Sequence, residues 1–486
     1  MPASAPIALT GATGFVGSWL LQNRPPGSEW IALSRSERVS DEDGVQWRQA
    51  DLFSLPSLTR ALTGAKVGIY LVHSMLPSSR LVQGSFADLD LLLADNFVRA
   101  AEEAGLEHLL YLGGLIPKGE DDLSEHLRSR REVETVLRSR SLEVTVLRSG
   151  LIYGRGGSST RLLIQLVRRL PVMILPKWTR ETTQSSDVRD VARAIDLCLH
   201  EPRFRGGTWD LASHEPMSYR EMILRTAKVL GHQPRTLNFP ANCIGLSRLW
   251  VALISQTTPR LVNPLLASLR HSLVAQDNLL RKTIASQAIP FEQSVRDSVD
   301  EEGRPDGYPQ RSQRRKNRRR LRQARRVRSV QRMPLPAGWD ALQVATCYGQ
   351  WLTRSSGTVI VVDRLEDGSL IFRLRWPRLV LLELHPSELT RHLQRRRVFY
   401  IRGGLLCRNE VEPPGRFEFR LVEEGRSVMA AIHEFPPRLP WWIYQYTQAL
   451  LHLLVMRAFG LHLKQLRAHP QETEESGFAS SQTFRM

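Results

Sequence analysis

The sequence has few cysteines and no recognisable leader segment. Its four cysteines, Cys198, Cys243, Cys347 and Cys407, are far apart and form no Cys-x-x-Cys pair. This distribution argues against a disulfide framework or a zinc site, so we expect reduced cysteines in a protein core. The first residues, MPASAPIALTGATG, contain neither a basic segment nor a long apolar run before the first glycine. We therefore expect no signal peptide and a cytoplasmic protein, with a peripheral place at a membrane left open.

A convincing membrane-spanning segment is also lacking. The stretch from Trp441 to Leu463 is apolar enough to raise the question, but five polar residues interrupt it: Gln445, Gln448, His452, Arg457 and His462. These groups would be costly in lipid. We expect a core helix or a groove-lining helix here, and the sequence leaves open whether it contacts lipid.

Positive charge is plentiful but unevenly distributed. The formal net charge is +18, and residues 311–332 alone hold twelve Lys or Arg and no Asp or Glu. Such a run is typical of a solvated linker or an arginine-rich helix. The alternative is a segment that binds a polyanion, either RNA or an anionic membrane surface.

The first 300 residues have the pattern of an α/β domain. Short apolar runs alternate with helical patterns, which is typical of βαβ units around a doubly wound parallel sheet, the Rossmann fold. We expect a helix over Asp88 to Ala104. The expected strands are Ile7 to Leu9, Trp30 to Leu33, Val67 to Val72, Leu109 to Leu112 and Val144 to Leu147.

The remainder predicts a smaller α+β domain. We place an arginine-rich linker at 301–336, the second domain at 337–468 and a disordered tail at 469–486. Within the second domain, one helix from Trp441 to about Leu466 should close an antiparallel sheet. The expected strands are Val359 to Val362, Leu370 to Leu374, Val398 to Ile401, Arg416 to Leu421 and Val428 to His433.

A glycine-rich loop follows the first strand and leads into a helix. It reads Thr10-Gly11-Ala12-Thr13-Gly14-Phe15-Val16-Gly17. Glycines at this spacing permit a tight turn, close approach to a pyrophosphate and close packing of the helix on the sheet. The loop therefore predicts dinucleotide binding through Thr10, Gly11, Thr13, Gly14, Phe15, Val16 and Gly17.

The residues after the second strand indicate which dinucleotide is preferred. An acidic residue there would accept hydrogen bonds from the ribose of NAD, but this chain has Ser34 and Arg35. A donor and a positive charge favour the 2′-phosphate of NADP, so we expect NADP rather than NAD. Asp51 and Leu52, after the third strand, should meet the adenine.

Together these segments resemble the short-chain dehydrogenase/reductase superfamily, in particular its atypical extended branch with the NmrA-like proteins and the 39 kDa subunit type of complex I. Further similar segments are YLVHSM at 70–75, DNF at 95–97, YLGGL at 111–115, RSGLIYG at 148–154 and VRDVA at 188–192. The resemblance covers about residues 5–300. The chain looks most similar to bacterial proteins in which such a domain is followed by a poorly characterised C-terminal domain. The resemblance implies a START-like helix-grip type for that domain, which would take an apolar small ligand.

The resemblance also implies a departure from the family's catalytic pattern. Catalytic members use a Tyr four residues before a Lys, and the ammonium lowers the pKa of the tyrosine. Here the corresponding positions are His126 and Arg130, after a strand that ends in Gly113 and Gly114. His126 is a weak candidate for proton exchange, and Arg130 a candidate for holding a ribose hydroxyl or a phosphate.

Four more residues are expected beside the cofactor. Val72 ends the fourth strand and His73 and Ser74 follow it, at the carboxyl edge of the sheet where Rossmann ligands bind. Tyr153 occupies the position of a pocket wall in the family.

These residues leave three classes of function open. The first is an NADP(H)-binding protein whose nucleotide is structural or regulatory. The second is an NADPH-dependent reductase of an apolar carbonyl or quinone-like substrate. The third is a scaffold that docks on RNA or an anionic membrane through residues 311–332.

Overall fold

The computed structural model describes residues 6–38, 43–73, 81–119, 122–239, 268–306, 326–357, 359–408 and 414–468. The chain forms two compact units. The first comprises Met1–Leu76 and Asp90–Gln313, and the second comprises Pro77–Leu89 and Arg314–Met486. Ser74, most of the arginine-rich segment and the predicted tail at 469–486 lie outside the described residues.

A seven-stranded sheet forms the centre of the first unit, and all its neighbouring strands are parallel. The order is β12 (Thr208–Leu211), β7 (Glu143–Ser149), β6 (His108–Gly114), β4 (Val67–Tyr70), β1 (Ile7–Thr10), β2 (Trp30–Ser34) and β3 (Val45–Gln49). The direction of winding reverses between β1 and β4, and ligands of such sheets bind at the carboxyl ends beside that point. The predicted Rossmann fold and its five predicted strands are confirmed.

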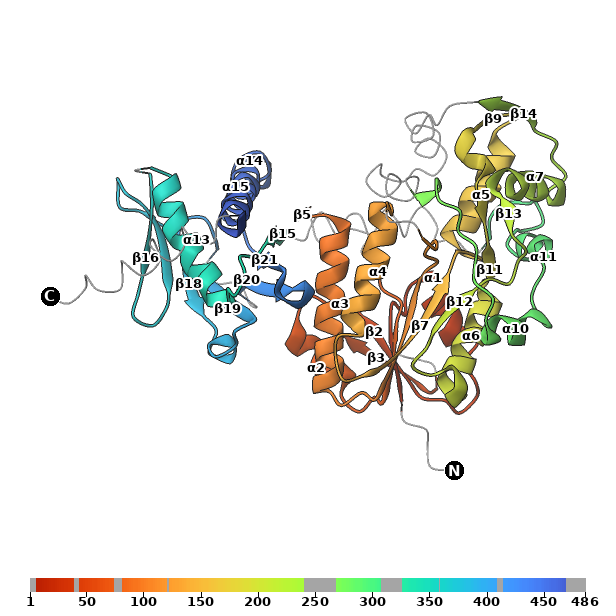
Figure 1. Cartoon of the computed structure of the whole chain (residues 1–486), viewed down its shortest axis with the longest axis horizontal. Helices are drawn as coiled ribbons and strands as arrows, with labels where there is room; N and C mark the ends of the chain where they lie inside the picture. Colours follow the sequence, from red (N-terminus) through yellow and green to blue (C-terminus); the bar gives the residue numbers. More distant parts are fainter. Residues whose placement is uncertain are drawn as a thin grey trace. The chain divides into compact units, whose positions relative to one another are not determined.

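Helices cover both faces of this sheet (Figure 1). On one face α2 (Leu55–Leu62), α3 (Phe86–Glu103) and α4 (Glu125–Leu137) bury side chains such as Leu58, Phe97 and Val133. On the other face α1 (Phe15–Gln22), α6 (Val188–His200) and α10 (Leu279–Ala285) bury Leu20, Ile195 and Leu280. Because both faces are covered, the central strands read as continuous apolar runs.

A smaller substructure completes the first unit. It pairs β8 (Leu151–Tyr153) with β11 (Ser185–Asp187), β9 (Val172–Pro176) with β14 (Arg235–Phe239), and β10 (Thr182–Thr183) with β13 (Met217–Ser218). The helices α5 (Ser158–Arg169), α7 (Tyr219–Val229) and α11 (Phe291–Arg296) pack there around a separate apolar core.

The second unit is built on an eight-stranded sheet. Its order is β16 (Ile360–Arg364), β17 (Leu370–Leu374), β18 (Val380–Pro386), β19 (Arg396–Gly403), β20 (Gly415–Val422), β21 (Ser427–Phe435), β15 (Val327–Pro334) and β5 (Leu81–Gln83). All pairs are antiparallel except β15 with β5. The predicted antiparallel sheet is confirmed.

Two strands of this sheet differ from the sequence prediction. Val327–Pro334 fall within the predicted linker 301–336, but they form β15 in the interior of the sheet. The linker therefore ends before Val327. The strand was missed because its arginines made the segment look like part of the basic linker, although Val327, Val330 and Met333 are apolar. The edge strand β5 comes from the chain between β4 and α3, a region predicted to belong entirely to the Rossmann domain.

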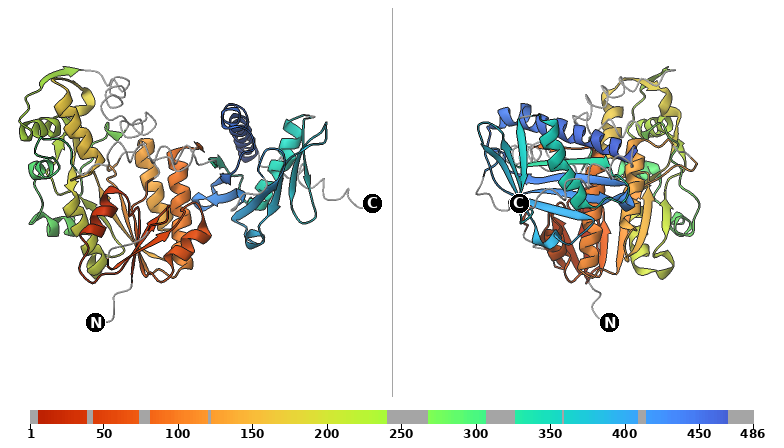
Figure 2. Two further views of the ribbon diagram at one scale, coloured as in Figure 1. Left: turned by 180° about the vertical axis from the view of Figure 1, so that it is seen from behind. Right: turned by 60° about the vertical axis from the view of Figure 1, so that its left-hand side comes forward.

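Two helical segments pack on one face of the sheet (Figure 2). They are α13 (Ala341–Ser355) and the pair α14 (Trp441–Tyr446) and α15 (Gln448–Ala468). The predicted single C-terminal helix is interrupted at Thr447, whose φ of −120° and ψ of −86° are not helical. Among the described residues, no helix combines the length and the apolar character that crossing a membrane requires.

Candidate nucleotide-binding and proton-transfer site

The glycine-rich loop turns between β1 and α1 at the carboxyl edge of the sheet. Gly11 has a φ of +72°, which favours glycine. The turn is closed by a hydrogen bond in which Gly14 N donates to Gly11 O at 2.8 Å. A Cβ on Gly17 would lie 2.3 Å from Gly11 O. The loop thus presents backbone N–H groups at the start of α1, an arrangement that suits a pyrophosphate.

The other loop residues differ in their exposure. Thr13 and Gly14 are exposed, and Phe15 and Val16 are half-buried. Thr10 is buried, and its hydroxyl donates to Ile69 O at 3.1 Å while accepting from Leu71 N at 3.3 Å. Thr10 therefore fastens β1 to β4, and its effect on a bound nucleotide would be through the position of the loop.

Ser34 is the last residue of β2 and Arg35 follows it. Ser34 is buried and its hydroxyl accepts from Ser36 N at 3.3 Å, whereas Arg35 is exposed. The backbone carbonyl of Arg35 accepts from Gln49 Nε2 at 3.2 Å, which ties the end of β2 to β3. An exposed guanidinium at this position fits the 2′-phosphate of NADP.

Asp51 and Leu52 follow β3 and are held by neighbouring side chains. Asp51 Oδ1 accepts from Phe53 N at 3.2 Å, and Leu52 O accepts from Asn96 Nδ2 at 2.9 Å. Asn96 is buried, and within the described part of the chain its Oδ1 atom has no hydrogen-bond donor. Asn96 therefore positions the loop that was expected to meet the adenine.

A histidine pair lies where β4 and α4 meet α3. His73 Nδ1 is 2.6 Å from Asp90 Oδ2, and the rings of His73 and His126 are 5.2 Å apart between centroids. Burial and the charge of Arg130 lower the pKa of His73, opposed by Asp90. The same causes, together with His73, lower the pKa of His126 to about 3. Both rings are therefore neutral near pH 7.

Arg130 is buried beneath this pair. Its NH1 donates to the hydroxyl of Tyr111 at 3.3 Å. Burial would lower the pKa of Arg130, but Tyr111 and Asp90 raise it. Burial raises the pKa of both Tyr70 and Tyr111. The two tyrosines of the cluster are thus poorer acids than a free tyrosine, the opposite of what a lysine partner achieves.

The structure brings together several predicted residues and adds others. His73, His126 and Arg130 form one cluster. The sequence placed His73 after one strand of the sheet and the other two residues on the helix that follows the next strand. Sequence analysis missed Asp90 as their partner. The available signal was its position on the core face of α3, where Leu93, Ala94 and Phe97 follow at helical spacing.

Tyr153 lies in a different place from the one predicted. It is buried, and its hydroxyl donates to Met222 Sδ at 2.7 Å. Its ring packs edge-on against Phe291 at 5.5 Å between centroids. Burial also raises its pKa. The side chain packs in the core beside α7, because β8 turns away from the central sheet to pair with β11, so a cofactor contact through its hydroxyl is not expected.

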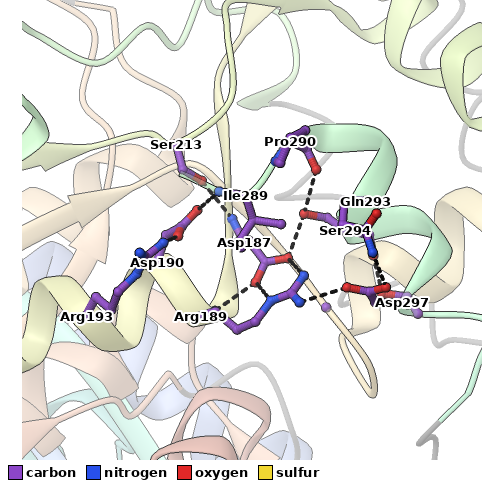
Figure 3. Close-up of polar contacts among 12 residues, drawn as sticks. Asp187, Arg189, Asp190, Arg193, Ser213, Ile289, Pro290, Gln293, Ser294 and Asp297 are labelled. Carbon is purple, nitrogen blue, oxygen red and sulfur yellow. Dashed lines mark hydrogen bonds and ion pairs between the residues drawn. The ribbon is translucent and has the colours of Figure 1, made fainter. Parts of the chain in front are cut away.

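The VRDVA segment takes part in a partly buried ionic network (Figure 3). Arg189 lies between two carboxylates, with Nε 2.8 Å from Asp187 Oδ1 and NH1 2.7 Å from Asp297 Oδ2. Ser294 Oγ donates to Asp187 Oδ2 at 2.6 Å. This network joins the start of α6 to α11, so its role is to hold the smaller substructure on the Rossmann sheet.

A shallow cavity of about 390 Å³ lies at the amino-terminal ends of β2 and β3. Its lining includes Trp30, Arg38 and Trp47, with the Arg38 guanidinium 4.9 Å from the centre of the Trp47 ring. This is the edge of the sheet opposite the glycine-rich loop. The cavity is therefore not part of the nucleotide site.

Comparison with known proteins finds a family that the first unit is similar to. Residues 7–212 match the model of the NAD dependent epimerase/dehydratase family. The auxiliary protein GraX of Staphylococcus aureus is 26% identical over 179 residues, which are 36% of this chain and 54% of that protein. The chain thus spans about half the length of GraX.

The chain is also similar to two reductases. The ceramide reductase of Caulobacter vibrioides is 27% identical over 247 residues, 48% of this chain and 73% of that enzyme. The solved structure of the Citrobacter sp. triphenylmethane reductase complexed with NADP(H) has 19% identity and a TM-score of 0.48, covering 60% of this chain and all of that one.

The glycine cradle, the seven-stranded parallel sheet and the family match agree with one another. Residues 7–212 of the first unit are therefore similar to the NAD dependent epimerase/dehydratase family, and the glycine-rich loop suits a nicotinamide dinucleotide.

Proposed function

We propose that the first unit binds NADP(H) in preference to NAD(H), and that the nucleotide has a structural or regulatory role. The preference is supported by the exposed Arg35 at the end of β2, with no carboxylate at Ser34 or Arg35 to repel a 2′-phosphate. The glycine-rich loop would hold the pyrophosphate through the backbone N–H groups around Gly14.

The observation that carries the structural or regulatory role is the pair His126 and Arg130. A neutral imidazole whose pKa is about 3 is a poor proton donor near pH 7. Arg130 is directed to Tyr111 and is buried, whereas the family's lysine both lowers a tyrosine pKa and holds the ribose. The cluster therefore suits positioning of a ligand better than proton delivery.

The test combines binding with turnover. The purified full chain is titrated with NADPH and with NADH by protein fluorescence, and Arg35→Asp should weaken NADPH binding while leaving NADH binding unchanged or stronger. NADPH absorbance is then followed with aldehydes, ketones and quinones. Tight NADPH binding without oxidation supports the proposal, and steady turnover with any of these acceptors would overturn the non-catalytic role.

A second candidate is an NADPH-dependent reductase of an apolar carbonyl or quinone-like substrate. The hydrogen bond between His73 and Asp90 favours it, because a carboxylate fixes the tautomer of an imidazole that exchanges protons. Bound NADPH would supply a hydride. A bound water would then supply the proton to the carbonyl oxygen, relayed through His73 or His126, so that an alcohol forms. The relationship to a ceramide reductase is consistent with an apolar substrate.

His73→Gln and His126→Gln variants test this second candidate. Each should lower kcat at least about tenfold while NADPH affinity stays within about twofold, since general acid catalysis contributes about 10² to 10⁴ in rate. The exposed His200→Gln serves as the matched control. Turnover in His73→Gln and His126→Gln equal to that of His200→Gln and the unchanged chain would show that the histidine pair does not transfer the proton.

The third candidate is docking of residues 311–332 on a polyanion. The strand β15 reduces the number of arginines in this segment that could contact one. Arg328 is buried and its guanidinium contacts Glu434, and Arg332 Nε is 2.8 Å from Asp88 Oδ1. A deletion that tests this role must therefore end before Arg326.

We propose that the chain works in the cytoplasm.

A further inference from the structure

One end of the second unit's sheet gathers exposed apolar side chains. The strand register places the start of β16, the β17–β18 turn, the end of β19 and the end of β21 at this end. The segment after β21 stays there, since Arg438 N donates to Leu406 O at 3.2 Å. We call this the sheet tip. Its exposed apolar residues are Val359, Trp376, Leu379, Leu405 and Trp442.

Trp376 is the most prominent of these residues. Its side chain is 88% exposed in the turn between β17 and β18, where Arg375 and Arg378 flank it and are also exposed. A tryptophan at a turn has no packing role in its own fold. An exposed tryptophan between two arginines combines the apolar and cationic groups found where proteins meet the headgroup region of a bilayer.

The same chemistry continues along α14 and α15. Trp442 and Tyr446 are exposed about one turn apart on α14, and Leu450 and Leu454 are exposed about one turn apart on α15, beyond the break at Thr447. Trp442 and Tyr446 are 70% and 74% exposed. Interfacial helices have such an apolar side with aromatic residues at its end.

The charge around this surface is predominantly positive, with Glu383 beside Gly403 as a described exception. Exposed arginines at the sheet tip are Arg375, Arg378, Arg402, Arg408 and Arg438. The described tip residues 359–360, 374–380, 402–408 and 435–442, and all of residues 436–468, contain no Asp or Glu. An apolar surface bordered mainly by cations complements an anionic one, and each Lys or Arg near an anionic lipid surface strengthens association about fivefold.

We propose that the sheet tip, with the exposed side of α14 and the start of α15, docks on the surface of an anionic phospholipid bilayer. Trp376 and Trp442 enter the headgroup region, and Arg375 and Arg378 contact the lipid phosphates. The chain lies on the bilayer without crossing it, in agreement with the lack of a membrane-spanning helix among the described residues. This surface is separate from the arginine-rich segment considered from the sequence.

The experiment is co-sedimentation of the full chain with vesicles of phosphatidylcholine alone and of phosphatidylcholine mixed with phosphatidylglycerol. Binding is expected only to the mixed vesicles, and it should weaken as salt rises. Arg375→Gln with Arg378→Gln should weaken binding about 25-fold. Trp376→Ser should weaken it roughly tenfold or more.

Matched controls lie at the opposite end of the same sheet. Leu389 is 82% exposed and Arg395 is exposed there, so Leu389→Ser and Arg395→Gln should bind as the unchanged chain does. All variants keep residues 311–325. An unchanged far-ultraviolet circular dichroism melt in each variant separates loss of docking from loss of folding.

Three results would overturn the proposal. The first is no binding to anionic vesicles. The second is binding that the tip variants leave intact, which would transfer it to another part of the chain. The third is binding to an RNA homopolymer or a protein partner that depends on Trp376 while vesicle binding is absent.

Discussion

The carboxylate of Asp90 holds the ring of His73 through a contact of 2.6 Å between Oδ2 and Nδ1. Asp90 lies on α3 and His73 directly after β4, so the contact joins two elements at the carboxyl edge of the Rossmann sheet. It also determines the electrostatics of the cluster, because Asp90 is the group that raises the pKa of His73 against burial and Arg130.

Replacement of Asp90 should therefore change the titration of His73. In Asp90→Asn the pKa of His73 should fall further below its usual value, because the only favourable charge is lost while burial and Arg130 remain. A pH titration of the imidazole resonances by nuclear magnetic resonance measures this. Asp95→Asn, on the same helix and paired with Arg99, should leave His73 unchanged. A rise in the pKa of His73 in Asp90→Asn would contradict the assignment.

His108 should make the first unit sensitive to acid. It is buried, and burial followed by the charge of Arg205 lowers its pKa from 6.5 to about 4. The unfolded chain therefore binds a proton between pH 6.5 and pH 4 that the folded chain excludes. Stability is complete above pH 6.5 and declines as the pH falls, by about 3 kcal/mol at pH 4.

Urea unfolding at a series of pH values checks this prediction. His108→Gln should lose some stability at pH 7, since His108 Nε2 is 2.8 Å from Thr145 Oγ1. Its free energy of unfolding should fall less steeply with acid than that of the unchanged chain. The exposed His200→Gln should keep the original slope, and an equally steep decline in His108→Gln would exclude His108 as the cause.

Glu418 should be essential to the second unit. It is buried in β20, and its Oε1 accepts from Arg396 Nε at 2.7 Å and Arg420 Nε at 2.6 Å. Burial opposes its ionisation, but these arginines and His433 hold its pKa well below the usual value. Glu418→Gln would leave the buried guanidinium of Arg420 and the largely buried one of Arg396 facing a neutral amide.

The expected cost is about 3 to 5 kcal/mol in the free energy of unfolding, which is typical when one partner of a buried ion pair is removed. Denaturant unfolding followed by circular dichroism measures it. Glu388→Gln, an exposed residue paired with Arg391, should change stability by less than about 0.5 kcal/mol. Similar values for the two variants would show that the buried cluster contributes nothing particular.

Ser294 should connect α11 to the start of α6. Its hydroxyl donates to Asp187 Oδ2 at 2.6 Å and lies 3.2 Å from His214 Nε2, all in buried surroundings. Ser294→Ala should destabilise the first unit by about 1 to 3 kcal/mol, because a buried carboxylate loses a donor. Thermal unfolding tests this, with the exposed Ser272→Ala expected to unfold as the unchanged chain does.

The sequence predicted the parts of the fold whose signal is local. The Rossmann strands are short apolar runs between helical patterns, and the glycine-rich loop has a spacing that only a tight strand-to-helix turn explains. β18 was not predicted, although Val380, Leu382 and Leu384 alternate along Val380–Pro386 and share one apolar face. β15 was not predicted because its arginines resemble those of a basic linker. The carboxylates that pair with them are distant in the sequence, so no local pattern reveals the pairing.

Long-range pairing limited the rest. β5 has three residues, and its Gln83 meets Ser329 across 246 positions in the chain, a separation for which no local pattern exists. The same holds for the site. His126 and Arg130 follow from their spacing on one helix, whereas Asp90 becomes a partner of His73 only when α3 packs beside β4.

Titration of the full chain with NADPH, followed by protein fluorescence, tests the central claim most directly when the unchanged chain is compared with Gly14→Asp. A Cβ at Gly14 would lie 3.0 Å from Gly11 O, and a carboxylate there would repel a pyrophosphate at the start of α1. We predict saturable NADPH binding that Gly14→Asp abolishes, with the thermal unfolding of the two proteins similar. Absence of NADPH and NADH binding to the unchanged chain would contradict the account.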